Sequence, residues 1–293
     1  LQGYPQSQVL SATYDAGRSV FSYLKGRKEA IEKAAKLLSS AKKPLIFVSG
    51  GAMEAGGEVT HLAEYLQAPV FAYRTGKGIL SSRHYLSYPV PAAHDLWAEA
   101  DVVIGIGSHV RMPLSKWGVD ENLKFISINI DNTAHDRIVK PTLSITADAG
   151  QATEALLKQL SKITSPTPSR KTEMEAFRKS WNKKTAYLEP QSTILKIIRE
   201  ELPDEGILVD ELTQVGFASR IVYDTYLPRT YLCTGFMGTL GWGFQTALGA
   251  KITKPEVPVI SVAGDGGFMF GVQELATAVQ HKIGVILLLF NNF

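Results

Sequence analysis

The sequence predicts an α/β protein built from two doubly wound, mainly parallel-sheet domains. Three observations indicate this class. Short, continuous apolar runs alternate with segments of helical composition, as is typical of parallel strands covered on both faces. A Pro/Ser/Thr-rich segment at 165–169 divides this pattern into two parts. The length of 293 residues and the hydrophobic fraction of 45% are sufficient for two separate cores.

The first α/β domain is predicted over residues 25–162, with a Rossmann-like alternation of strands and helices. Its expected strands are 45–48, 69–72, 102–106, 125–130 and 143–145. Helical patterns alternate with these strands, at 27–41, 55–67 and 151–160. Residues 1–24 show no sustained period, so we expect a linker or entry segment there.

The second α/β domain is predicted over residues 191–293, after a linker and a charged helix at 163–190. Its expected strands are 206–210, 258–263 and 284–290, and its expected helices are 192–201, 214–226, 244–252 and 272–281. A glycine-rich stretch, 235–243, is expected to be irregular. The chain begins without Met and stops directly after a strand-like run, which favours a piece of a longer protein.

Composition excludes several classes of function. The net charge of +3 is too small, and the basic residues too scattered, to favour a nucleic acid or a membrane as a partner. The single cysteine, Cys233, precludes an intrachain disulfide and fits a reducing compartment. No apolar run reaches the length of a membrane span, and no signal peptide is visible. We therefore expect a cytoplasmic or organelle-matrix protein that is not secreted.

Two polar motifs follow neighbouring predicted strands near the end of the chain. Gly264-Asp265-Gly266-Gly267 comes directly after the strand at 258–263, and Asn291-Asn292 follows the strand at 284–290. A spacing of 27 residues between Asp265 and Asn292 suits one strand–helix–strand unit. Because such a crossover makes the two strands parallel, both motifs are expected at the same edge of the sheet. That edge is where open α/β sheets bind ligands.

The chemistry of these residues favours a metal–diphosphate site. Asp265 and Asn292 offer hard oxygen ligands and leave most of an octahedral Mg²⁺ shell for phosphate oxygens and water. Gly266 and Gly267 allow backbone N–H groups to approach a phosphate closely. The alternative is an ordinary Gly-Asp-Gly turn without a ligand, which the second motif argues against.

These motifs resemble the cofactor signature of thiamine-diphosphate-dependent enzymes, and the acetolactate synthases in particular. The segments that resemble acetolactate synthases are 264–266 with 291–292, 272–278, 238–243 and 247–250. The resemblance covers essentially the whole chain and is most specific in 206–293. It implies a central domain followed by a cofactor domain, with thiamine diphosphate and Mg²⁺ as cofactors.

The resemblance also implies roles for individual residues. Thr213 and Gln214 would contact the diphosphate together with Gly264, Gly266 and Gly267, while Asp265 and Asn292 would hold the metal. The carbonyl of Gly238 would accept from the exocyclic amine of the cofactor. The Leu240 N–H would donate to the pyrimidine, and its side chain would keep the cofactor bent. Acetolactate synthases usually have Gln-His where this chain has Thr213-Gln214, which leaves the substrate open.

No catalytic residue is assigned within this chain. In the family the glutamate that protonates the pyrimidine belongs to a preceding domain, and the site forms between two subunits. A homodimer or homotetramer of the complete protein is therefore implied.

Flavin binding by the central domain stays open at this point. Gly50-Gly51, Asp131 and Asp148-Ala149 resemble positions that bind FAD in acetolactate synthases. However, residues 108–113 lack the Arg- and Asp-rich stretch of that family. FAD is thus possible, but we expect little or none, and a purely structural domain is the alternative.

The function implied is decarboxylation of a 2-oxo acid followed by ligation or release of the aldehyde unit, as in acetolactate synthases. One alternative is a decarboxylase or C–C lyase of the same superfamily that is similar to benzoylformate decarboxylase. A second alternative, from another class, is a non-catalytic nucleotide-binding module. The fragment alone is expected to be inactive, because half of each active site would lie elsewhere.

Overall fold

The computed structural model describes residues 28–292, so the predicted linker at 1–24 lies outside the described residues. The chain divides into two compact units. One contains the residues up to Ala68 together with Trp97–Pro168, and the other contains Pro69–Leu96 together with the residues from Ser169 onward. The segment Pro69–Leu96 therefore packs with the second unit, although by sequence it lies within the predicted first domain.

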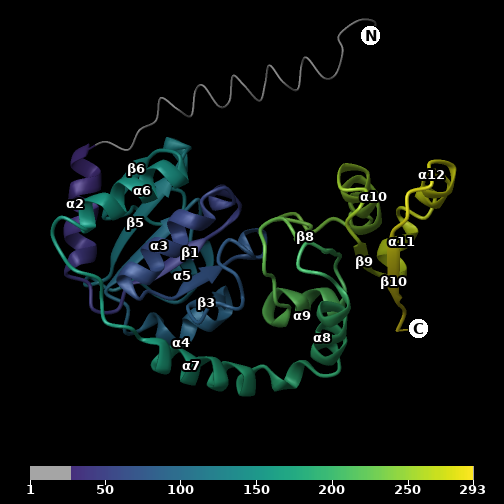
Figure 1. Ribbon diagram of the computed structural model, residues 1–293, viewed down its shortest axis with the longest axis horizontal. Helices are drawn as coiled ribbons and strands as arrows, with labels where there is room; N and C mark the ends of the chain where they lie inside the picture. Colours follow the sequence, from purple (N-terminus) through teal and green to yellow (C-terminus); the bar gives the residue numbers. More distant parts are fainter. Residues whose placement is uncertain (1–27, 293) are drawn as a thin grey trace, which may run out of the picture. The chain divides into compact units, whose positions relative to one another are not determined.

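A six-stranded, mainly parallel sheet has the doubly wound strand order β3-β2-β1-β4-β5-β6. Its strands are β1 (Leu45–Val48), β2 (Val70–Ala72), β3 (Ser87–Pro89), β4 (Val102–Ile106), β5 (Lys124–Asn129) and β6 (Leu143–Thr146). Strands β1, β5 and β6 of this sheet are labelled in Figure 1. The central strands β1 and β4 are buried along their whole length because helices cover both faces.

The helices of the first unit are amphipathic and turn their apolar residues inward. They are α2 (Lys28–Ser39), α3 (Gly56–Leu66), α5 (Arg111–Lys116) and α6 (Ala149–Leu160), with 3₁₀ turns η1 (Gly50–Ala52) and η4 (Asn132–Ala134). Helix α6 begins at a cap in which the Asp148 side chain accepts from the Gln151 N–H. Leu156 and Leu160, on the opposite end of that helix, are fully buried.

The second unit is built on a four-stranded sheet of order β10-β9-β7-β8, with every pair parallel. Its strands are β7 (Ile207–Asp210), β8 (Tyr231–Cys233), β9 (Val259–Gly264) and β10 (Ile286–Phe290). Its longer helices are α7 (Lys171–Lys184), α8 (Gln191–Glu201), α9 (Gln214–Val222) and α10 (Gly243–Thr253). Shorter elements are η2 (Arg74–Gly76), η3 (Val90–Ala93), α4 (His94–Trp97), η5 (Ala186–Leu188), α11 (Asp265–Met269) and α12 (Glu274–Gln280).

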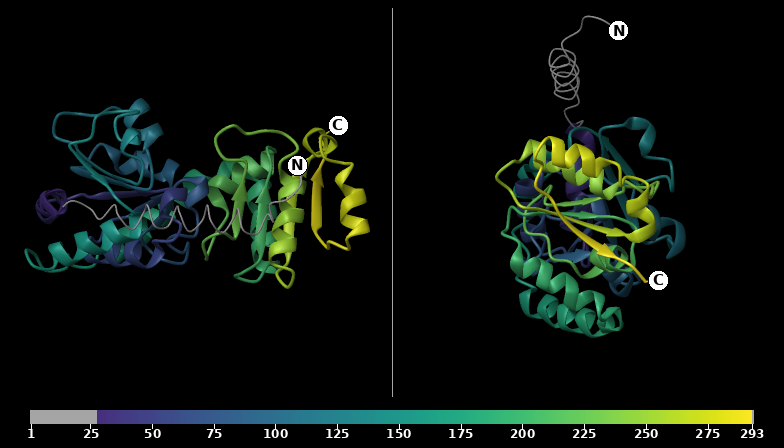
Figure 2. Two further views of the ribbon diagram at one scale, coloured as in Figure 1. Left: turned by 90° about the horizontal axis from the view of Figure 1, so that it is seen from above. Right: turned by 90° about the vertical axis from the view of Figure 1, so that its right-hand side faces the viewer.

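Alternate residues of the strands in this sheet face two separate cores, as the period of two requires. Leu208, Ile260 and Val262 pack with α8 and α9 on one face. Val209 and Val259 pack with α10 on the other face. The two helix layers are visible on either side of this sheet in Figure 2.

The structure differs from the sequence-based expectation in several elements, including the short helices α4 and α5, which were not predicted. Strands β3 and β8 have three residues each and were not predicted, because neither contains a long apolar run. The single helix expected at 272–281 is α12, and the short α11 precedes it directly after β9. Helix α9 ends at Val222, four residues earlier than expected. No helix in the described part of the chain combines the length and apolarity needed to cross a bilayer.

Candidate active site

Strands β9 and β10 bring Asp265 and Asn292 to one edge of the four-stranded sheet. The two strands are paired in parallel, and Phe290 lies opposite Gly264 in the register. Asp265, the first residue of α11, therefore lies one residue beyond Gly264. Asn292 lies two residues beyond Phe290. The geometry places both predicted metal ligands at adjacent strand ends.

The surroundings of Asp265 and Asn292 fit a role in holding a cation. Both residues are exposed, and no hydrogen bond or ion pair occupies either side chain within residues 28–292. A Cβ added at Gly266 would meet no atom within 4 Å, so space for a ligand lies beside the turn. The described residues contain no cluster of three or more His, Cys, Asp or Glu side chains that could hold a metal. A cation here would thus take most of its ligands from a diphosphate and water.

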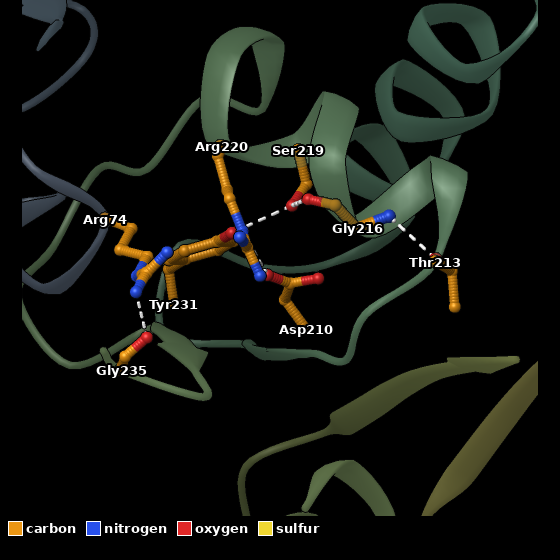
Figure 3. Close-up of polar contacts among 8 residues, drawn as sticks. All are labelled: Arg74, Asp210, Thr213, Gly216, Ser219, Arg220, Tyr231 and Gly235. Atoms are coloured by element: carbon orange, nitrogen blue, oxygen red, sulfur yellow. Dashed lines mark hydrogen bonds and ion pairs between the residues drawn. The ribbon is translucent and has the colours of Figure 1, made fainter. Parts of the chain in front are cut away.

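The end of the neighbouring strand β7 contributes Thr213 and Gln214. Thr213 caps α9, and its hydroxyl accepts from the Gly216 N–H at 2.8 Å, which leaves the hydroxyl proton available to a phosphate (Figure 3). Gly264 lies beside Thr213, because a Cβ at Gly264 would be 3.3 Å from the Thr213 methyl group. Gln214 is exposed in the first turn, with its amide 3.1 Å from that of Gln191.

Gly238 and Leu240 lie in the irregular segment between β8 and α10, as predicted. Gly238 and Gly241 have φ values of +63° and +73°, which L side chains rarely adopt. Leu240 is 48% exposed, so this large apolar side chain has little protein to pack against. The structure therefore places the predicted pyrimidine-binding segment at the strand ends of the same sheet and leaves Leu240 accessible to a ligand.

Glu211 is a site residue that the sequence interpretation did not single out. It follows Asp210 at the end of β7 and is fully buried. One carboxylate oxygen accepts a short hydrogen bond from the Gly241 N–H, and the same oxygen would lie 2.9 Å from a Cβ at Gly267. Burial raises the pKa of Glu211, and the N–H groups of Gly241, Trp242 and Gly243 oppose that rise. The available signal was an acidic residue directly after a buried strand, a position that water rarely reaches.

Asp210 belongs to a buried polar network next to this edge (Figure 3). Its Oδ2 accepts from the Tyr231 hydroxyl at 3.0 Å and from Arg220 Nε at 3.2 Å. The Tyr231 hydroxyl also lies 2.8 Å from Ser219 Oγ. Burial raises the pKa of Asp210 to about 6, although Arg220 opposes the rise. This network fixes α9 against β7 and β8.

Besides Glu211, a second side chain contacts the glycine-rich segment 235–243, at its first residue. Arg74, in η2, donates to the carbonyl oxygen of Gly235 (Figure 3). Arg74 and Gly235 belong to the same compact unit. The segment 235–243 is therefore held by Arg74 at its first residue and by Glu211 near its last.

The residues considered for FAD lie at the carboxyl ends of strands in the first unit. The Gly51 N–H donates to the Gly107 carbonyl at 3.3 Å, and a Cβ at Gly107 would be 2.3 Å from the Gly51 carbonyl carbon. Asp131 caps η4 and pairs with Arg137 at 2.9 Å, and Asp148 caps α6. These residues thus have structural partners of their own.

Comparison with known proteins identifies the family of this chain. Residues 31–156 match the family model described as the thiamine pyrophosphate enzyme central domain. Residues 212–293 match the model of the thiamine pyrophosphate enzyme C-terminal TPP binding domain. The chain belongs to the thiamine pyrophosphate enzymes, whose cofactor is the thiamine diphosphate named above.

Individual relatives carry two kinds of name. A probable acetolactate synthase large subunit from Methanococcus aeolicus is 30% identical over 296 residues, which cover 91% of this chain and 49% of the relative. A probable 2-ketoarginine decarboxylase from Pseudomonas aeruginosa is 30% identical over 280 residues, covering 90% and 48%. The acetolactate synthase isozyme 3 large subunit of Escherichia coli is 28% identical, covering 91% and 50%. The chain spans about half the length of the curated relatives it matches.

Proposed function

We propose that this chain supplies the central and cofactor-binding domains of an enzyme that uses thiamine diphosphate and Mg²⁺ to decarboxylate a 2-oxo acid. The observation that carries the proposal is the position of two exposed side chains with oxygen ligands, Asp265 and Asn292, at adjacent strand ends. Gly266 directly follows Asp265 and has open space beside it. An acid, an amide and an open glycine turn are what a metal-bridged diphosphate requires.

The chain's own residues bind and orient the cofactor in this proposal. Asp265 and Asn292 hold Mg²⁺, and Thr213, Gln214, Gly264, Gly266 and Gly267 surround the diphosphate. When bound, thiamine diphosphate supplies the carbon nucleophile and the electron sink for loss of CO₂.

The pyrimidine half of the site consists of Gly238 and Leu240. The Gly238 carbonyl would accept from the exocyclic amine, and the exposed Leu240 side chain would support the bent shape of the cofactor. Orientation of this kind is the main contribution of a protein to cofactor chemistry. The pyrimidine-protonating glutamate is proposed to come from a domain outside these 293 residues, in a homodimer or homotetramer.

The leading assignment within this chemistry is an acetolactate-synthase-like carboligase. The names of several relatives support it. A 2-oxo-acid decarboxylase is the second candidate, because a relative of equal identity is named as a decarboxylase. This chain has Thr213-Gln214 in place of the Gln-His of acetolactate synthases. This difference favours keeping both the carboligase and the decarboxylase as candidates.

The test is product analysis with the full-length protein, thiamine diphosphate and Mg²⁺, using pyruvate and other 2-oxo acids as substrates. A carboligase converts two molecules of pyruvate to one 2-acetolactate and one CO₂, whereas a decarboxylase converts each pyruvate to free acetaldehyde and CO₂. Turnover that needs both thiamine diphosphate and Mg²⁺ supports the proposal. Full turnover after removal of thiamine diphosphate contradicts it.

A further inference from the structure

The predicted pyrimidine-binding segment has little internal structure to fix its shape. Residues 235–243 contain four glycines, and three of them, Gly235, Gly238 and Gly241, have positive φ values. Glycine loses more conformational freedom on folding than any other residue, so such a segment is costly to order. Met237 and Leu240 are exposed and contribute little packing. Something outside the segment must therefore hold it in place.

Glu211 makes the contacts that this segment needs. Its side chain is 0% exposed, and one of its oxygens accepts from the Gly241 N–H. The N–H groups of Trp242 and Gly243, at the start of α10, also face the carboxylate closely enough to lower its pKa. Unpaired N–H groups at a helix start favour a negative charge, so an ionised Glu211 suits this position.

The same carboxylate contacts the predicted diphosphate turn. A Cβ at Gly267 would be 2.9 Å from one Glu211 oxygen, and a Cβ at Gly243 would be 2.9 Å from the other. Only residues without a side chain fit at these two positions. Glu211 thus lies between the turn that contains Asp265 and the segment that contains Leu240.

One oxygen of Glu211 has no hydrogen-bond partner within the described residues, although it is buried. Leaving a carboxylate oxygen unpaired in this way is unfavourable, and an apolar residue would avoid that loss. A purely packing role for position 211 therefore explains the structure poorly. Holding the backbone N–H of Gly241 explains it better, because a charged acceptor makes the stronger hydrogen bond.

We infer that Glu211 is a positioning residue for the cofactor. Its carboxylate fixes the segment 238–243 against the turn at Gly267, so that the pyrimidine and diphosphate halves of the site keep one spacing. It touches neither cofactor half itself and acts through Gly241 and Gly267. This inference rests on the proposed function, because it assumes that these two segments bind thiamine diphosphate.

The experiment measures amide hydrogen exchange in the full-length protein without cofactor, in the wild type, Glu211→Gln and Glu211→Ala. Glutamine keeps the size of the side chain but loses the charge and turns an N–H₂ group toward other N–H groups. We expect exchange in peptides covering 238–244 to rise about tenfold or more in Glu211→Ala and by a smaller factor in Glu211→Gln. Peptides from β7 and β9 should exchange at wild-type rates.

Asp210→Asn is the matched control, because Asp210 is an equally buried neighbouring carboxylate that does not contact the segment. It should leave exchange in 238–244 at the wild-type rate. Titration with thiamine diphosphate and Mg²⁺ adds a second readout, in which Glu211→Gln should bind about tenfold more weakly than the wild type. If Glu211→Ala does not fold, Glu211→Gln alone carries the comparison.

Wild-type exchange of 238–244 in every folded Glu211 variant would overturn the inference. An equal rise in all peptides, including β7 and β9, would also overturn it, because Glu211 would then serve general stability only. Failure of the wild type to bind thiamine diphosphate contradicts the proposed function instead. In that case the exchange data still decide whether Glu211 holds the segment.

Discussion

Leu240 is an exposed apolar residue in the predicted pyrimidine-binding segment. A leucine side chain left 48% exposed at the end of a sheet gains little from the protein around it. Its neighbours Gly238 and Gly241 adopt positive φ values that direct the backbone around it. We therefore expect its bulk to matter for turnover, because it would keep the cofactor bent.

Leu240→Ala should reduce turnover of the full-length protein roughly ten- to a thousandfold, with a smaller change in cofactor affinity. In the proposed function, metal and diphosphate contacts at Asp265 and Asn292 would supply most of the affinity, and the substitution would leave them unchanged. Leu240→Met keeps the volume and should retain most activity. The measurement is hydrogen–deuterium exchange at C2 of bound thiamine diphosphate. Wild-type exchange in Leu240→Ala would show that the side chain does not orient the cofactor.

At the scale of elements, the contact between β7 and α9 depends on one glycine. A Cβ at Gly216 would lie 2.0 Å from the Glu211 carbonyl oxygen and 2.1 Å from Asp210 Oδ1. Both are fixed parts of the strand end, so neither moves easily. The first turn of α9 lies close to β7 because position 216 has no side chain.

Gly216→Ala should therefore destabilise the protein by about 2 kcal/mol, as overpacked positions do. Gly249→Ala is the matched control, because Gly249 lies in α10 and an added Cβ there meets nothing within 4 Å. Alanine in that helix should be neutral or stabilise by about 0.5–1 kcal/mol. Urea unfolding of both variants measures the difference. Equal stabilities for the two variants would contradict the described packing of α9.

The sequence predicted the longer elements well and the short ones poorly. Strands β1, β4 and β9 are continuous apolar runs, so their positions were predicted within one or two residues. Strands β3 and β8 have three residues each and depend on pairing with a neighbour rather than on their own composition.

The residues of the candidate site were likewise predicted only where a local sequence pattern indicated them. Asp265 and Asn292 were predicted because a strand–helix–strand unit fixes where both strands end. The role of Glu211 was not predicted. Its hydrogen-bond partner Gly241 lies 30 residues further along the chain, and no local sequence pattern indicates that the two residues are in contact.

At the scale of the whole molecule, Asp210 links stability to pH. Its pKa is raised from 3.8 to about 6, so the folded protein retains a proton that the unfolded chain releases between these values. This contribution to stability is fully present below about pH 4 and is lost as the pH rises to about 6. Asp210→Asn should remove this part of the pH dependence. Thermal unfolding of both proteins from pH 4 to 7 measures it, and parallel curves would contradict the assignment.

The first unit leads to a separate prediction about flavin. Asp131 and Asp148 serve as helix caps, and Gly51 and Gly107 contact each other directly. The stretch 108–113 also contains a single arginine, Arg111, and no aspartate. We expect the purified full-length protein to contain little or no FAD. A stoichiometric flavin absorbance band in the visible spectrum would contradict this expectation.

The central claim is that Asp265 and Asn292 hold a divalent cation that binds the diphosphate of the cofactor. Isothermal titration of the full-length protein with thiamine diphosphate, with and without Mg²⁺, tests it most directly. The wild type should bind only with Mg²⁺, Asp265→Ala should lose this binding, and Asp265→Asn should weaken it less, because the amide keeps one oxygen ligand. Unchanged, Mg²⁺-dependent affinity in Asp265→Ala would contradict the claim.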